Sequence, residues 1–101
     1  MSTKDLQRVH PLLSDRVRLM IMVHLSIAGG PVDFTSLLAA LELTKGNLST
    51  HLRKLEEATL ISVNKEFIDR KPRTTYACTS TGRQDLQTYL NTIESLLKQV
   101  R

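Results

Sequence analysis

The stretch LTKGNLSTHLRKLEE, residues 43–57, decides the fold because it predicts one helix with two different faces. Leu48, Leu52 and Leu55 recur at the spacing of a buried helical stripe. The other side of this helix gathers polar and basic side chains: Lys45, Asn47, Ser49, Thr50 and Arg53. Their hydrogen-bonding capacity exceeds what a solvated face requires, so we interpret this side as a candidate contact surface.

A shorter helix is predicted directly before this one. Asp33 is a suitable N-cap, and four apolar residues then follow the i, i+3, i+4, i+7 pattern: Phe34, Leu37, Leu38 and Leu41. After a tight turn at Glu42 and Leu43, Thr44 is the predicted N-cap of the longer helix, which should end near Ala58. Two helices joined in this way form a helix-turn-helix pattern.

The period then changes from that of a helix to that of a β-hairpin. Residues 60–68 alternate, with Ile61, Val63 and Phe67 on one side, which predicts a half-buried strand. A charged turn is predicted at residues 69–72 and a return strand at 73–78. The predicted hairpin therefore has a basic tip, in the position of a wing that follows a helix-turn-helix.

A longer helix is predicted from Ser14, its expected N-cap, to Ala28, where a Gly-Gly-Pro sequence stops it. Its middle, residues 19–23, is apolar on every face, which indicates burial on more than one side. In so small a domain the second side can be another subunit, so Leu19 and Met22 are candidate dimer contacts. A short extra helix is expected before it.

The last predicted helix begins at Thr79 or Ser80 and reaches about Val100. Its apolar residues are spaced alternately four and three apart, as in a coiled-coil seam: Leu86, Leu90, Ile93, Leu97 and Val100. We expect this seam to pair two copies of the chain. The alternative is that it packs on the body of its own domain.

Two runs, GNLSTHLRKLEE and KPRTTYACTSTGR, carry a resemblance to winged helix-turn-helix transcriptional regulators of the ArsR/MarR type. The chain is most similar to the small stand-alone dimeric winged-helix regulators of bacteria and archaea, over roughly residues 10–100. The resemblance implies a mainly α fold with a small β-hairpin and a long C-terminal dimerisation helix. It also implies one DNA-binding domain over residues 1–101, with a winged-helix core at 10–80 and the dimerisation helix at 80–100.

Two departures from this family bear on the expectations. Thr59 stands where the family usually has a Gly that ends the recognition helix in a left-handed conformation, so we expect a different helix end here. The Cys pairs and His/Asp clusters of metal-sensing ArsR proteins are missing, so no metal site and no cofactor are implied.

The resemblance assigns the residues that would contact double-stranded DNA. In the recognition helix, which would enter the major groove, they are Thr44, Lys45, Gly46, Asn47, Ser49, Thr50, Arg53 and Lys54. In the wing, which would lie on the backbone or in the minor groove, they are Lys65, Arg70, Lys71 and Arg73. Arg53 is the candidate for a guanine contact, and Asn47 could pair with adenine. Alternatively, the charges of the wing are simply solvated or paired with Glu66 and Asp69.

The placement of charge agrees with a polyanion partner. The formal net charge is +4, and all of the excess lies between residues 44 and 83, where eight basic side chains face four acidic ones. The chain has a single cysteine, Cys78, and no apolar run long enough to span a bilayer, so we expect a cytoplasmic protein without disulfides. Cys78, His24 and His51 are interpreted as structural residues, and no catalytic constellation predicts an enzyme.

The function predicted from the sequence is a homodimeric, sequence-specific DNA-binding regulator with a palindromic operator. The alternative from another class is a winged helix used for protein–protein interaction in a larger assembly. Binding to RNA ranks last, because aromatic residues are scarce at 4%. A groove between the first and last helices could hold a small-molecule effector, but no residue pattern identifies one.

Overall fold

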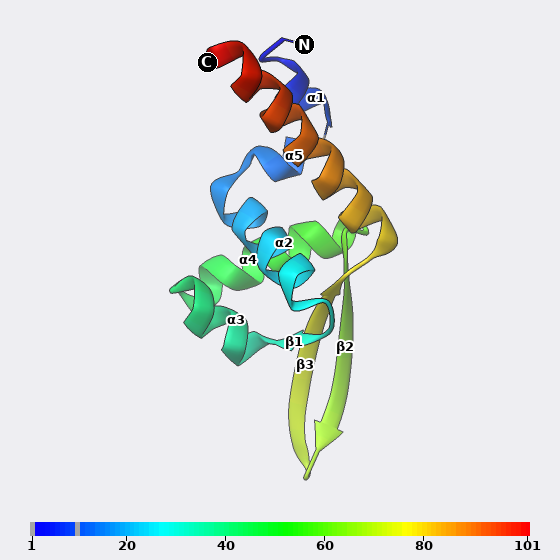
Figure 1. The fold of residues 1–101 in the computed structure, drawn as a ribbon. Coiled ribbons are helices and arrows are strands. Elements are labelled where there is room, and N and C mark those ends of the chain that lie inside the picture. Colours follow the sequence, from blue (N-terminus) through cyan, green and yellow to red (C-terminus); the bar gives the residue numbers. More distant parts are fainter. Residues whose placement is uncertain (1, 10) are drawn as a thin grey trace.

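The computed structural model describes residues 2–9 and 11–101. The elements follow the order α1 (Asp5–Val9), a 3-10 helix η1 (Pro11–Ser14), α2 (Arg16–Ala28), β1 (Val32–Asp33), α3 (Phe34–Leu41), α4 (Lys45–Glu57), β2 (Ile61–Ile68), β3 (Lys71–Cys78) and α5 (Ser80–Val100). The predicted mainly α class with a β-hairpin and a long last helix is confirmed. The hairpin projects from one end of a helical centre, and α5 extends from the other (Figure 1).

The core is aliphatic, as the scarcity of aromatic residues requires. The predicted stripe of α4 is buried, with Leu48, Leu52 and Leu55 at most 3% exposed. The other core side chains come from the surrounding elements: Leu13, Ile21, Met22, Leu25, Leu37, Leu60, Ile61, Cys78, Leu86 and Tyr89. Helix α4 is therefore held along one full face and leaves the opposite face free.

Each of the three central helices begins at a side chain that caps it. Asp33 accepts a hydrogen bond of 2.7 Å from the backbone N–H of Ser36, and Thr44 accepts one of 3.2 Å from Asn47, as predicted. The predicted cap of α2 is wrong. Ser14 closes the preceding 3-10 turn, and Asp15 caps α2 by accepting 3.0 Å from the N–H of Arg18.

The sheet has three antiparallel strands in the order β1-β3-β2. The two-residue strand β1 was not predicted. The turn is shorter than predicted, because Ile68 pairs directly with Lys71 and only Asp69 and Arg70 connect the strands. Both have positive φ, 51° and 65°, as the two central residues of a type I′ turn require.

The expected burial of β2 is only partly correct. Ile61 is 2% exposed and Val63 is half-buried, but Phe67 is 77% exposed. The strand keeps its alternation beyond Val63, yet no other element covers it there, so Phe67 lies in solvent at the outer end of the hairpin.

The end of α4 contradicts the expectation drawn from Thr59. Thr59 adopts the left-handed conformation with φ 61° although it is not Gly. Two backbone bonds enforce the conformation: the N–H of Leu60 donates to Leu55 O at 3.0 Å, and the N–H of Thr59 donates to Glu56 O at 2.9 Å. This pair is the Schellman arrangement, and its apolar contact is supplied by the buried Leu55 and Leu60.

The start of α5 is joined to this helix end. Thr79 caps α5, and it also donates its N–H to Leu60 O at 3.1 Å and its hydroxyl to Thr59 O at 2.6 Å. Gly82 lies so close to Leu60 that a Cβ at position 82 would overlap the carbonyl of Leu60. The first turn of α5 therefore sits directly on the residues that end α4.

Candidate nucleic-acid interface

The face of α4 opposite the core is exposed along its whole length. Every residue that the sequence assigned to DNA contact on this helix is exposed: Thr44, Lys45, Gly46, Asn47, Ser49, Thr50, Arg53 and Lys54. Two hydroxyls are already engaged, because Thr44 caps the helix and Thr50 donates to Gly46 O at 2.9 Å. Lys45, Asn47, Ser49 and Arg53 therefore supply most of the polar groups that are available to a ligand.

A part-buried cluster fixes α4 against the N-terminal segment. Arg18 donates its Nε–H to the carbonyl of Leu12 at 2.8 Å, and its Nη1 lies 3.1 Å from His51 Nδ1. Because a guanidinium can only donate, Nδ1 of His51 is the acceptor and the imidazole proton is on Nε2. The carboxylate of Asp15 lies 4.0 Å from the same ring nitrogen. His51 thus has the packed, hydrogen-bonded role that the sequence predicted.

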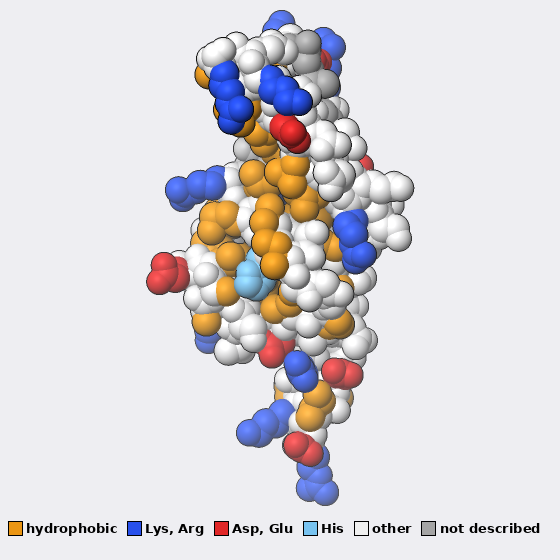
Figure 2. All heavy atoms as spheres, in the orientation of Figure 1, with side chains coloured by type: hydrophobic (Ala, Val, Ile, Leu, Met, Phe, Trp, Pro, Cys, Tyr) orange, Lys and Arg blue, Asp and Glu red, His pale blue; other side chains and the backbone are white. Residues whose placement is uncertain are grey.

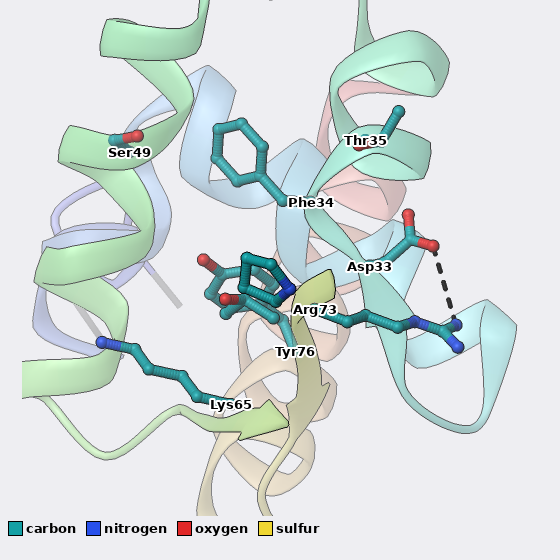
Figure 3. Close-up of a pocket in the computed structure, with 9 residues that line it drawn as sticks. Asp33, Phe34, Thr35, Ser49, Lys65, Arg73 and Tyr76 are labelled. Carbon is teal, nitrogen blue, oxygen red and sulfur yellow. Dashed lines mark ion pairs between the residues drawn. The ribbon is translucent and has the colours of Figure 1, made fainter. Parts of the chain in front are cut away.

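A groove of about 540 Å³ separates α4 from the hairpin and the start of α3. It is lined by Asp33, Phe34, Thr35, Ser49, Lys65, Pro72, Arg73, Thr74 and Tyr76. Lys65 extends from β2 toward α4, whereas Arg73 points to Asp33 (Figure 3). The groove therefore carries hydroxyls and one ammonium on the same side as the exposed face of α4.

Arg73 has a partner that the sequence did not predict. Its Nη2 lies 3.6 Å from the Asp33 carboxylate. The hydrogen bonds from Ser36 lower the pKa of Asp33, and the charge of Arg73 lowers it further. Asp33 therefore has two tasks, since it caps α3 and ties the base of the hairpin to that helix.

The rest of the hairpin is basic and exposed. Lys65, Arg70 and Lys71 are all exposed, as the sequence assignment required; Arg70 lies in the turn and Lys71 directly follows it. Figure 2 shows basic side chains at the projecting end of the molecule, with hydrophobic side chains beside them. Phe67 and Ile68 are exposed there, and the exposure of Phe67 was missed because alternation alone predicts burial for its face.

A family model described as "Winged helix DNA-binding domain" matches residues 17–97. The chain belongs to the winged-helix DNA-binding family. Within this fold, α3 and α4 are the helix-turn-helix, with α4 the recognition helix, and β2 and β3 are the wing.

The chain is similar to a relative and to solved structures from archaea and from Bacillus subtilis. An uncharacterised protein of Methanocaldococcus jannaschii is 35% identical over 68 residues, which cover 67% of this chain and 74% of the relative. A transcriptional regulator homologue from Pyrococcus horikoshii is 29% identical, with a TM-score of 0.86 over 97% of this chain and 98% of that one. The regulator YodB from Bacillus subtilis shares the winged-helix fold, with 19% identity and a TM-score of 0.74 over 98% and 94% of the two chains.

A hydrophobic band lies away from the recognition helix, over α5 and α2 (Figure 2). On α5 it contains Leu90, Ile93, Leu97 and Val100, which are between 37% and 82% exposed. On α2 it continues into a depression of about 370 Å³ lined by Leu19, Met20, Val23, His24, Ile27 and, from α3, Leu41. We call these residues the apolar band.

Two of the predicted dimer contacts lie in the core instead. Met22 is 0% exposed and Leu86 is 4% exposed, so neither has surface to offer a partner. The core side of α5 carries Tyr89 and Thr92, which are 7% and 3% exposed. The apolar seam of α5 thus divides, with its first residue in the domain core and the other four in solvent.

Cys78 behaves as a small buried hydrophobe, as predicted. It is 8% exposed, its Sγ lies 3.7 Å from the carbonyl of Met22, and burial raises the pKa of its thiol. Across residues 2–9 and 11–101, no group of three or more His, Cys, Asp and Glu side chains could hold a metal ion. In the same residues no helix is long and apolar enough to cross a membrane.

Proposed function

We propose that this winged-helix protein is a homodimeric regulator of transcription that reads a palindromic operator. The observation that carries the proposal is the exposed face of α4, which is polar and basic although the opposite face is fully packed. An α-helix fits the major groove, where polar side chains can distinguish all four base pairs. The 29% identical homologue from Pyrococcus horikoshii, which carries the description of a transcriptional regulator, supports the same reading.

Within α4 the residues divide by chemistry. Arg53, which is exposed beside the depression that Val63 and Lys65 also line, is proposed to read a guanine, and Asn47, in the first turn of the helix, is proposed to pair with an adenine. Lys45, Ser49 and Lys54, together with the amides of the first turn, would hold phosphates. Gly46 has open space around it and would let the backbone approach a phosphate closely.

In the wing, Lys65, Arg70 and Lys71 are the proposed contacts to the backbone or the minor groove. Arg73 is exposed as well, but its ion pair with Asp33 directs it to α3. We therefore assign Arg73 mainly to holding the wing and only secondarily to DNA.

The proposed dimer forms through the apolar band. Leu90, Ile93 and Leu97 repeat with the spacing of a helix pair and are exposed in one chain. Burying them against a second copy would remove large exposed hydrophobic side chains of α5 from water. Two-fold symmetry would then place two copies of α4 in successive major grooves, about 34 Å apart.

The experiment is a selection from a random duplex library at two salt concentrations. We expect one enriched palindrome and an affinity that falls steeply with salt, because each phosphate contact adds to the salt dependence. Arg53→Ala should cost about 1–3 kcal/mol at one base position in each half-site and leave the other positions unchanged.

Lys98→Ala is the matched control, because it removes a basic side chain from the far end of α5. It should leave the selected sequence unaltered. Binding without sequence preference and with a shallow salt dependence would contradict the proposal and favour a winged helix that binds protein.

A further inference from the structure

Phe67 is the one aromatic side chain that the domain leaves in water. The chain has two Phe and two Tyr residues. Tyr89 is buried, and the rings of Phe34 and Tyr76 pack together with their centroids 6.5 Å apart. Phe67 is 77% exposed at the outer end of the hairpin. A large apolar ring held in solvent on a projecting hairpin points to a ligand surface.

The register of the hairpin fixes the side of the wing on which Phe67 lies. Val63 pairs with Tyr76, Lys65 with Thr74, and Phe67 with Pro72. Alternate residues of a strand share a face, so Val63, Lys65 and Phe67 lie on the same one. Val63 and Lys65 line a depression with Arg53 of α4. Phe67 is therefore the outermost residue of the hairpin face that borders the recognition helix.

The position of Phe67 suits the minor groove next to the proposed half-site. Phe67 is four residues beyond Val63, or about 13 Å at 3.3 Å per residue. One turn of DNA is about 34 Å, so a minor groove lies about half that distance from the major groove that α4 would occupy. Strand β2 as a whole, Ile61–Ile68, spans about 26 Å at the same rise, so the hairpin is long enough to reach the neighbouring groove.

The net positive charge around Phe67 indicates that the ligand of this surface is a polyanion. Residues 65–73 contain four basic side chains and two acidic ones. Lys65 lies on the same face as Phe67, and Arg70 and Lys71 are exposed at the turn just beyond it, where they can bind phosphates along a groove. An apolar ring between cations matches the pattern of proteins that insert a wedge between base steps of the minor groove.

We propose that Phe67 is an apolar wedge that enters the minor groove beside each half-site, partly unstacks one base step and bends the duplex. The proposal rests on the proposed DNA-binding function and deepens it. Pyrimidine–purine steps unstack most easily, so the wedge makes the operator prefer such a step at a position that no hydrogen bond reads.

The test uses the selected operator with 2-aminopurine placed at single flanking positions and with fluorophores at the two duplex ends. Wild-type protein should raise the 2-aminopurine emission at one step per half-site and shorten the end-to-end distance. Phe67→Ala should abolish both changes and weaken binding about tenfold, in the range of one lost stacking contact, with the salt dependence unchanged.

Two variants serve as controls. Phe67→Leu keeps an apolar wedge and should keep the bend. Ile68→Ala removes the neighbouring side chain, which alternates to the other face of the hairpin, and should change neither signal.

The outcomes separate the wedge from the function on which it rests. If the wild-type protein selects an operator and Phe67→Ala bends that operator as much as the wild type does, the wedge is overturned and the proposed regulatory function stands. A wild-type protein that binds no duplex overturns both. Phe67-dependent binding to vesicles of anionic lipid, without any change in 2-aminopurine emission, overturns the wedge in favour of a membrane contact.

Discussion

At the scale of single residues, Thr59 shows how packing can impose a backbone conformation on an unsuited residue. A left-handed conformation costs an ordinary L-residue about 1–2 kcal/mol relative to its preferred regions. Thr59 adopts it because the buried Leu55 and Leu60 close the end of α4 and because Thr79 hydrogen-bonds the Thr59 carbonyl. The contacts of the neighbours therefore outweigh the local preference of a β-branched side chain.

Replacing Thr59 with Gly should raise the free energy of unfolding by about 1 kcal/mol, since Gly adopts positive φ without strain. Urea or thermal unfolding measures the change. Ala58→Gly is the matched control, because Ala58 has φ −85° and gains nothing from Gly. It should lower the stability. A Thr59→Gly protein that unfolds more easily than the wild type would show that the Thr side chain stabilises this helix end.

At the scale of elements, two junctions of the domain are each held by one side chain with two partners. Asp33 links α3 to β3 through Ser36 and Arg73, and Thr79 links α4 to α5. The exposed ion pair by itself contributes little, about 0–1 kcal/mol. The cap and the ion pair share one carboxylate, however, so the stability of this junction depends on its charge.

Because the pKa of Asp33 is lowered in the folded domain, the ionised carboxylate stabilises the fold. Its contribution is complete above the ordinary Asp pKa of about 4 and is lost as the pH falls through the lower folded value. Asp33→Asn keeps a capping side chain without the charge. We expect its free energy of unfolding to fall less between about pH 5 and pH 2 than that of the wild type.

Unfolding measured across this pH range tests the prediction. Glu57→Gln removes a charge from an exposed position of α4 and controls for the change in net charge. Parallel pH profiles for wild type and Asp33→Asn would mean that the cap and the ion pair do not depend on the carboxylate charge.

Elements with a local signal were predictable from the sequence, and those defined by distant partners were not. The stripe of Leu48, Leu52 and Leu55 lies within one helix, so the sequence predicted both the buried and the exposed face of α4. Strand β1 exists only because it pairs with Thr75 and Tyr76, more than forty residues away. The period of a strand likewise shows that Phe67 shares a face with Ile61, but not that no element covers it.

The candidate site divides in the same way. Exposure of the basic residues of α4 and the hairpin followed from periodicity, whereas the ion pair of Arg73 depended on the unpredicted pairing of β1 with β3. Met22 was assigned to a dimer interface because its helix is apolar on every face. Which of those faces meets the rest of the domain is a tertiary property, and Met22 lies on the covered one.

At the scale of the whole molecule, the chain is elongated, with extents of 53, 25 and 21 Å. The hairpin and α5 lie at opposite ends with the recognition helix between them (Figure 1). The basic tip and the exposed apolar residues of α5 are thereby kept apart. One end is suited to a polyanion and the other to an apolar partner, as the proposed dimer on DNA requires.

Leu90→Glu or Ile93→Glu should convert the proposed dimer to monomers, because each would bury a charge in the seam. Light scattering measures the mass, and circular dichroism checks that the fold is retained. Asn91→Glu adds the same charge beside the seam and should leave the dimer intact. A dimer that survives both seam variants would place the interface elsewhere.

The attachment of Thr79 and Gly82 to the end of α4 has a consequence for how such a regulator can change its targets. The recognition helix α4 and helix α5 are therefore held in one relative orientation. In the proposed dimer, the crossing angle of the two α5 helices would then set the distance between half-sites. The base sequence of each half-site would depend on side chains of α4, and the distance between the half-sites would depend on side chains of α5. Mutation could then revise one without the other, and a redesigned spacing would require no change to any residue that touches a base.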